Sequence, residues 1–318
     1  MKNKQTIFKL IVIMLIAVSL LLVGCGNTSQ GGGSTGGNGS SSSTGSNTGS
    51  SDSTPIEPPV EIPANVTHTS WKILKGKITE TTVHKYVTDK PGPKIVIVGG
   101  IHGDEDAGWT AALRLVNTIS QEKGICGEIL LIPQANILAD NALVRYNVKG
   151  MGVTFSDLNR SFEVGRESTA KSATIEISDA LVETIDEFIG DYQIEEDYDL
   201  CIIDLHESRG SYTEGTAAKG FLGDQLICKN NPFFMEDLLD HYNSNYRELG
   251  DPDFRTEESV TDGSFSLNFS TKYRKATVFT IETNRGYKNG TNTIALEKRV
   301  SQQLNILQAL FDLAWQRI

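Results

Sequence analysis

Positive charge, cysteine and histidine are all scarce in this sequence, and each scarcity limits the kinds of partner or site that the protein can have. The 318 residues include 29 Lys and Arg against 40 Asp and Glu, which gives a formal net charge of −11 at pH 7. This balance argues against a nucleic-acid partner held through phosphate contacts. The 4 cysteines show no spacing typical of a zinc finger or of a cysteine nucleophile. With only 5 histidines, a histidine-based site has few candidates.

The cysteines allow at most one disulfide outside the N-terminal segment. Apart from Cys25 they are Cys126, Cys201 and Cys228, an odd number. Cys201 lies in the apolar run Leu200–Ile203 and is expected to be a small buried residue. A bridge between Cys126 and Cys228 would suit an oxidising compartment, but their spacing does not decide whether it forms.

The N-terminal 24 residues have the organisation of a secretory signal. Three lysines precede the apolar stretch Leu10–Leu22, which is too short and wrongly flanked to span a membrane. The following Leu22-Val23-Gly24-Cys25 resembles the lipobox of bacterial lipoproteins. We therefore expect residues 1–24 to be removed and Cys25 to carry a lipid. The rest of the chain would lie outside the cytoplasm, attached to the membrane only through that lipid.

Residues 25–64 are expected to form a flexible tether. From Gly26 to Thr54 almost every residue is Gly, Ser, Thr or Asn, so too little apolar surface is available for a core. The prolines between Pro55 and Pro63 favour an extended chain. A folded domain is therefore expected over residues 65–318, a length that suits one sizeable α/β domain with a single core.

Strand-like and helix-like segments alternate along this domain and predict an α/β fold. The predicted strands are Trp71–Ile78, Glu80–Val87, Lys94–Val98, Glu128–Ile132, Tyr198–Asp204 and Lys275–Thr283. The predicted helices are Trp109–Gln121, 174–190, Pro232–Leu249 and Thr293–Trp315. Loops are predicted at Pro133–Phe162, Ser208–Ala218 and Asp251–Ser266. The first of these is long, and a mostly irregular insert of that length in a compact domain is usually functional.

Three predicted strands end in side chains that can bind a metal or move a proton. In chain order these are His102 with Glu105, then His206, and finally Glu282. Gly99-Gly100 would let the backbone turn sharply before the first pair. Ligands of open α/β sheets bind at the carboxyl ends of the strands. Two histidines and one glutamate with an open fourth position are typical of a catalytic zinc site, whereas a closed structural site would need a fourth ligand, typically a cysteine.

Four short motifs together resemble the zinc carboxypeptidase superfamily, especially its succinylglutamate desuccinylase/aspartoacylase branch. They are His102-Gly103-Asp104-Glu105, Asp157-Leu158-Asn159-Arg160, Asp204-Leu205-His206 and Thr280-Ile281-Glu282-Thr283, in the order found in the family. The resemblance covers residues 94–285. It implies a mixed, largely parallel twisted sheet flanked by helices on both faces.

The same resemblance implies how the metal site is built. His102, Glu105 and His206 would hold one zinc ion. Glu282 would be the general base that takes a proton from the attacking water and passes it to the leaving amine. Asp204 precedes His206 by two residues on a strand and points to the same face, so it could orient that ligand.

Further matched residues imply a substrate site. Asn159 and Arg160 would hold a substrate carboxylate, for which the planar guanidinium fork is suited. Arg145 precedes this pair in the same loop and is the candidate for the arginine that polarises the scissile carbonyl. Glu207 and Asp104 adjoin the proposed ligands but are expected to face elsewhere. Candidate hydroxyl donors are Tyr212, Tyr246 and Tyr273.

These inferences predict a membrane-anchored, extracytoplasmic zinc hydrolase that cleaves an amide bond adjacent to a substrate carboxylate. The motifs favour an N-acyl amino-acid deacylase, whereas location outside the cell favours a metallocarboxypeptidase that acts on peptides, including cell-wall stem peptides. A non-catalytic ligand-binding lipoprotein with the same fold is one alternative, and a cell-surface structural module is another. The expected partner is a small molecule or peptide with a free carboxylate. Side-chain specificity and oligomeric state stay open.

Overall fold

The computed structural model describes residues 65–122, 124–146, 148–210, 222–251, 253–288 and 291–316. The predicted signal peptide, Cys25, the tether and Tyr212 lie outside these residues. Within them, no helix has both the length and the apolar character needed to cross a membrane.

The described chain forms one eight-stranded sheet with the strand order β1-β2-β4-β3-β5-β8-β6-β7. Its strands are β1 (Val66–Ile73), β2 (Thr81–Thr88), β3 (Lys94–Gly99), β4 (Glu128–Ile132), β5 (Leu200–Ser208), β6 (Gln225–Cys228), β7 (Arg255–Glu257) and β8 (Thr277–Asn284). The central strands β4, β3, β5 and β8 are parallel, while β1, β2 and β6 join antiparallel. The expected mixed, largely parallel sheet is confirmed.

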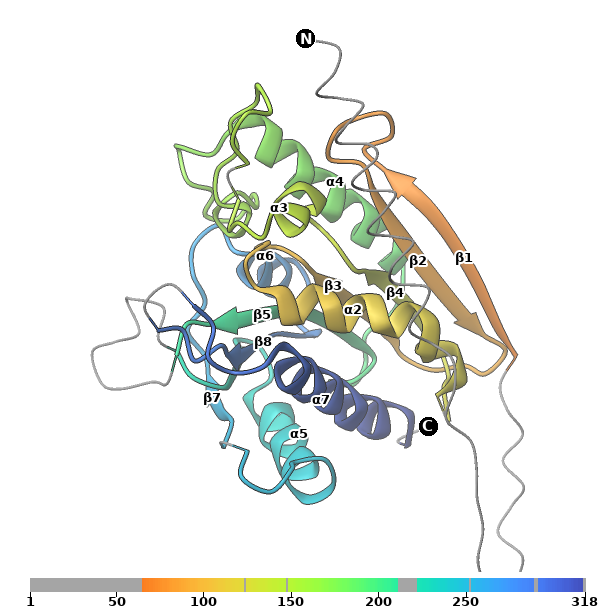
Figure 1. Cartoon of the computed structure of the whole chain (residues 1–318). Coiled ribbons are helices and arrows are strands. Elements are labelled where there is room, and N and C mark those ends of the chain that lie inside the picture. The colour runs from red at the N-terminus through yellow and green to blue at the C-terminus, as the bar shows by residue number, and fades with distance from the viewer. Residues whose placement is uncertain are drawn as a thin grey trace, which may run out of the picture. The chain divides into compact units, whose positions relative to one another are not determined.

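Helices cover both faces of this sheet (Figure 1). They are α2 (Asp106–Thr118) with its extension η1 (Ile119–Gln121), α3 (Ile137–Ala142), η2 (Leu158–Arg160), α4 (Ser172–Ile189), α5 (Pro232–Asn245), α6 (Phe265–Lys272) and α7 (Leu296–Gln316). Helices α2, α5 and α7 pack in one apolar cluster, and α4 and α6 in another. In Figure 1, α2 and α7 lie side by side.

The core is divided between the two faces, contrary to the single core expected. Ile95 and Ile97 of β3 belong to the cluster with α2, whereas Val96 and Val98 belong to the cluster with α4. Successive side chains of a strand point to opposite faces, so a continuous apolar run is what a strand needs when both faces are covered. All nine residues of β5 are buried for the same reason.

Several predicted boundaries are wrong, mostly where elements are short or exposed. Strand β1 begins at Val66, ahead of the predicted Trp71, and it is held by antiparallel pairing with β2 although most of its side chains are exposed. The region predicted as mostly irregular, Pro133–Phe162, contains two short helices, α3 and η2, that were not predicted. Strands β6 and β7 and helix α6 were not predicted at all. Four- and three-residue strands carry too few residues for a periodic pattern.

The three described cysteines are buried and free, so Cys126 and Cys228 do not form a bridge. Cys126 lies just before β4 and Cys228 ends β6, four strand positions apart in the sheet. At about 4.8 Å per strand this separation is roughly 19 Å, far beyond the Cα distance that a disulfide allows. Cys201 is fully buried, as predicted.

Candidate active site

A tight turn between β3 and α2 presents the first two candidate ligands. Gly100 has φ +76°, and a Cβ atom there would lie 2.4 Å from Asp140 Oδ2. A Cβ atom on Gly103 would lie 2.0 Å from the carbonyl carbon of Ala139. Side chains at these positions would push the turn away from α3. The expected sharp turn is therefore present, and it places His102 and Glu105 at the carboxyl end of the sheet.

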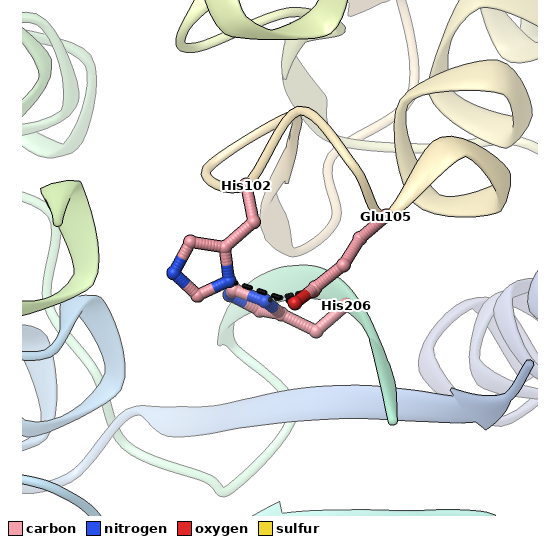
Figure 2. A group of neighbouring side chains, drawn as sticks. All are labelled: His102, Glu105 and His206. Carbon is pink, nitrogen blue, oxygen red and sulfur yellow. Dashed lines mark hydrogen bonds and ion pairs between the residues drawn. The ribbon is translucent and has the colours of Figure 1, made fainter. Parts of the chain in front are cut away.

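His102, Glu105 and His206 converge in the structure (Figure 2). His102 Nδ1 lies 2.9 Å from Glu105 Oε1, and His206 Nδ1 lies 2.6 Å from Glu105 Oε2. All three residues are buried, and one potential ligand atom from each lies within 4.8 Å of the others. Two imidazole nitrogens and a carboxylate at these separations suit a divalent cation.

The outer nitrogens of both histidines are held by carboxylates. His102 Nε2 lies 2.8 Å from Asp157 Oδ1, and His206 Nε2 lies 2.8 Å from Asp204 Oδ2. These contacts orient the rings so that both Nδ1 atoms face Glu105, which is the arrangement typical of histidines that bind a metal. The predicted contact of Asp204 with His206 is confirmed. The matching role of Asp157 was not foreseen, although the residue belongs to one of the quoted motifs.

The electrostatics of these groups also fit a cation. Burial alone would lower the pKa of His206, but Asp204 and Glu105 outweigh it and raise that pKa well above its usual range. Burial would raise the pKa of Glu105, but the two histidines hold it well below its ordinary value. The surroundings thus favour positive charge next to ionised carboxylates, and a bound metal would supply that charge.

Glu282 lies beside this group on the neighbouring strand. It is in register with His206 between β8 and β5, and the two side chains project to the same side of the sheet. Its Oε2 atom is buried and accepts no hydrogen bond from the described residues. Burial, followed by repulsion from the Glu105 carboxylate, raises the pKa of Glu282 to about 7. A carboxyl group with this pKa can both take up and release a proton near neutral pH.

Arg145 reaches the same group from the segment after α3. Its Nη1 donates to Glu105 Oε1 at 3.2 Å, and its Nε donates to Asp157 Oδ2 at 3.0 Å. The guanidinium therefore lies beside the candidate metal ligands, as its predicted role requires.

Asn159 and Arg160 approach from η2. Asn159 Oδ1 accepts the backbone N–H of Phe265 at 2.9 Å, which ties η2 to the start of α6. Asn159 Nδ2 lies 3.5 Å from His206 Nε2. Arg160 Nη1 donates to the carbonyl of Asn159. The pair is thus held next to the histidines by the backbone of a segment about 100 residues further along the chain.

One cavity of about 780 Å³ brings the predicted site residues together. All seven line it: His102, Glu105, Arg145, Asn159, Arg160, His206 and Glu282. Other polar residues of its wall were not predicted, among them Arg209, Gln225, Arg255, Ser266 and Arg285. For Arg285 a signal existed, since it follows Glu282 by three residues. Gln225 and Arg255 belong to the short strands that sequence periodicity did not reveal.

The remaining predictions concern nearby residues. Tyr246 bonds to Asp312, and Tyr273 donates to Asp186 at 2.7 Å, so neither hydroxyl faces the cavity. Neither residue lines the cavity, so Tyr246 and Tyr273 are wrong as candidate hydroxyl donors, whereas Tyr212 lies outside the described residues. Glu207 turns its carboxylate away from the histidines, as expected, and accepts the backbone N–H of Ala107 at 2.9 Å.

Comparisons with known proteins give a family match over part of the chain and similar solved folds. Residues 91–218 match the family described as the succinylglutamate desuccinylase/aspartoacylase catalytic domain. The matched segment contains the three candidate ligands and ends before Glu282. No curated protein matches the chain.

Solved structures of similar fold include three with descriptions that bear on this site. An aspartoacylase family protein from Mesorhizobium loti has 22% identity and a TM-score of 0.50, over 77% of this chain and 67% of that one. Succinylglutamate desuccinylase from Vibrio cholerae has 18% identity and a TM-score of 0.51, over 78% and 66%. The D,L-carboxypeptidase Csd4 from Helicobacter pylori, bound to mDAP, has 16% identity and a TM-score of 0.51, over 70% and 51%.

At these identities the structural matches establish the fold. The alignments span between about half and two thirds of the length of these proteins. The fold of the sheet and its helices is therefore similar to that of proteins described as a succinylglutamate desuccinylase and a D,L-carboxypeptidase.

Proposed function

We propose that this chain is a zinc-dependent hydrolase of the desuccinylase/aspartoacylase family that cleaves an amide bond next to a substrate carboxylate. The observation that carries the proposal is the register of Glu282 with His206. It places a carboxyl group of near-neutral pKa beside the His102–Glu105–His206 group in a single cavity. A purely structural metal site does not require a buried carboxylate without a hydrogen-bond partner at this position, whereas a catalytic site requires a group that can accept a proton.

The metal would be held by Nδ1 of His102, Nδ1 of His206 and the carboxylate of Glu105. When bound, zinc supplies Lewis acidity, which favours deprotonation of water and polarises a carbonyl. Asp157 and Asp204 keep the two imidazoles in the orientation that this binding needs, through the 2.8 Å contacts to their Nε2 atoms.

Glu282 would move the proton. Its raised pKa lets it take a proton from the attacking water and then donate that proton to the leaving amine nitrogen. The position one strand away from His206 puts the carboxyl group within side-chain reach of a water at the metal group. Glu282 is the catalytic residue of the proposal.

The arginines and Asn159 would hold the substrate. Arg145 lies against Glu105, so it can stabilise the negative charge that develops on the carbonyl oxygen during attack. Asn159 and Arg160 offer amide and guanidinium donors to the carboxylate next to the scissile bond. The substrate is therefore a peptide with a free carboxylate or an N-acyl amino acid.

The test uses the protein without residues 1–24 and with Cys25→Ser, so that no lipid is attached. Zinc content is measured by elemental analysis, and hydrolysis is followed on a panel of peptides and N-acyl amino acids. We expect about one zinc per chain and hydrolysis that Glu282→Gln largely abolishes. A chain that binds no zinc, or a variant as active as the wild type, would refute the proposal. Zinc and ligand binding without turnover would support the alternative of a binding lipoprotein.

We also propose that the chain is anchored outside the cytoplasm through lipid on Cys25. The supporting feature is the Leu22-Val23-Gly24-Cys25 sequence after a signal-like segment. Metabolic labelling with a tritiated fatty acid in a bacterial host should mark the wild type but not Cys25→Ser. Equal labelling of both proteins, or none of either, would contradict the anchor.

A further inference from the structure

Two of the five histidines form a pair outside the active-site cavity. His68 Nε2 on β1 lies 3.1 Å from His84 Nδ1 on β2, and the two rings are stacked with an interplanar angle of 20°. Neither residue lines the cavity. In Figure 1, β1 and β2 lie side by side at one edge of the sheet. The pair is therefore separate from the proposed zinc centre.

Antiparallel pairing places the two rings on the same face of the sheet. His68 is opposite Tyr86, and His84 is opposite Ser70, so the two histidines are diagonal neighbours across the strands. Residues that face each other across a ladder share a face, as do residues two apart on one strand. Long side chains of diagonal neighbours can reach each other. The register of β1 on β2 thus brings the two imidazoles together.

Tyr86 holds the ring of His68 in place. Tyr86 is 1% exposed, and its hydroxyl donates to the carbonyl of Val116 at 2.8 Å. The ring of His68 stacks on Tyr86 with centroids 4.3 Å apart and an interplanar angle of 4°. His84 is held through its backbone, because β2 pairs with β1 on one side and with β4 on the other. Two side chains that are already ordered lose little conformational freedom when they bind a common ligand.

The outer nitrogens of the pair leave its protonation pattern free. Among the described residues, no hydrogen bond involves His68 Nδ1 or His84 Nε2. By contrast, His241 Nε2 lies 3.0 Å from Asp312 Oδ2, and its Nδ1 lies 3.2 Å from Asn245 Nδ2. A neutral imidazole carries one hydrogen, which in His68 and His84 can occupy the outer nitrogen. Both inner nitrogens then present a lone pair to a shared ligand.

The separation of the inner nitrogens suits a transition-metal ion. Zinc–nitrogen bonds are about 2.0–2.1 Å long, so an ion bound to both nitrogens has an N–metal–N angle of roughly 100°. This angle lies between those of square-planar and tetrahedral coordination. Burial, followed by repulsion from His68, lowers the pKa of His84, which favours the neutral ring that a metal requires.

We propose that His68 Nε2 and His84 Nδ1 bind a divalent transition-metal ion, with water in the remaining coordination positions. Imidazole ligands suit Cu²⁺, Ni²⁺ and Zn²⁺, and Cu²⁺ should bind most tightly of the three. The site is weaker than the cavity group, because it has two protein ligands and no carboxylate that orients the rings. It does not depend on the proposed hydrolase activity.

The ion would link the edge strand to its neighbour. Among the described strands, β1 pairs only with β2, and six of its eight residues are exposed. An ion bound to one side chain of each strand adds a connection that backbone pairing does not supply. Because a site formed by two strands exists only in the folded state, binding stabilises their pairing. Hydrogen exchange of the β1 amides should therefore slow when the ion is bound.

The test is a calorimetric titration with Cu²⁺, on the chain without residues 1–24 and with Cys25→Ser. The wild type should show a binding event that His68→Ala and His84→Ala each weaken by about 10-fold or more, because one ligand is lost. The matched control is His241→Ala, which should leave this event unchanged. Copper that enters the cavity group contributes alike to all these proteins, so the difference between them reports the surface pair.

Hydrogen exchange followed by mass spectrometry supplies a local readout. Cu²⁺ should slow exchange in the β1 peptide of the wild type and of His241→Ala, but not of His68→Ala or His84→Ala. Circular dichroism checks that the variants are folded, and His68 is exposed, so its replacement should not disturb the core. If copper binding and β1 exchange are the same in the wild type and both pair variants, the inference is overturned. An equal loss in His241→Ala would overturn it as well.

Discussion

Two buried charge networks meet at the end of β5, one on each face of the sheet. His206 projects toward the cavity, where Glu105, Asp157 and Asp204 surround the two histidines. The next residue, Glu207, projects to the other face, where Arg299 and the backbone N–H of Ala107 bind its two carboxylate oxygens. We call these the cavity network and the helix network.

The helix network is closed, whereas the cavity network is open. No side-chain oxygen or nitrogen of Glu207, Asp106 or Arg299 is buried without a partner. Around the cavity, buried atoms without a described partner occur on Asp104, Asp204, Glu282 and Arg285. Unsatisfied buried polar groups cost stability, so their presence beside the cavity network and their absence from Glu207, Asp106 and Arg299 indicate that the cavity network is shaped for a ligand.

Glu282→Gln should produce the largest effect on the cavity side. We expect kcat to fall by about 10²-fold to 10⁴-fold, because the general base is lost, while KM changes little. The melting temperature should stay the same or rise, since a buried carboxylate is replaced by a neutral amide. Steady-state kinetics and thermal unfolding measure the two parts. A large loss of stability would mean that Glu282 belongs with the structural residues.

Arg299→Leu should show the opposite behaviour in the helix network. Removal of one partner leaves Glu207 and Asp106 without their cation and should cost about 3–5 kcal/mol of unfolding free energy. Urea denaturation of the variant tests this, with the exposed Arg114→Leu as a control that should change stability by less than about 0.5 kcal/mol. If Arg299→Leu hardly changes the free energy of unfolding, the distinction between the two networks is wrong.

Asp157→Asn should weaken the metal without unfolding the domain. Loss of the carboxylate that orients His102 is expected to reduce zinc affinity about 10-fold to 100-fold, measured by competition with a chromogenic chelator. Asp204→Asn should act similarly on His206. Asp104→Asn is the matched control, because its carboxylate contacts Arg285 and neither histidine. Unchanged affinity in both test variants would show that the rings are oriented by other means.

Asp224→Asn should have the smallest effect, and this effect on stability should depend on pH. Burial raises the pKa of Asp224 to about 6, while its carboxylate accepts the N–H of Asn284 at 3.0 Å. A folded-state pKa above the unfolded value means that the stabilisation is present at low pH and is lost as pH rises through about 6. Asp224→Asn keeps the acceptor and should gain roughly 1–2 kcal/mol relative to the wild type at pH 7.5 but little at pH 4.5. An equal effect at both pH values would contradict this.

Much of the central sheet and of the site follows from local sequence. Strands β3, β4 and β8 are continuous apolar or β-branched runs and lie close to their predicted positions. The turn after β3 carries the predicted ligands His102 and Glu105, β5 carries His206, and β8 carries the predicted general base Glu282. The structure brings these four residues together at one cavity. The short strands β6 and β7 have no such pattern, because their pairing with β8 and with each other, and not their own periodicity, makes them strands.

The local sequence pattern of residues 94–285 was therefore enough to predict that His102, Glu105, His206 and Glu282 lie at the ends of strands. Only the tertiary structure decided which ring nitrogens face Glu105, that Asp157 pairs with His102, and that Arg285 and Arg160 line the same cavity. The physical reason is distance along the chain. Contacts between groups 50 to 180 residues apart depend on strand register and on the packing of loops at the sheet edge, which no local pattern encodes.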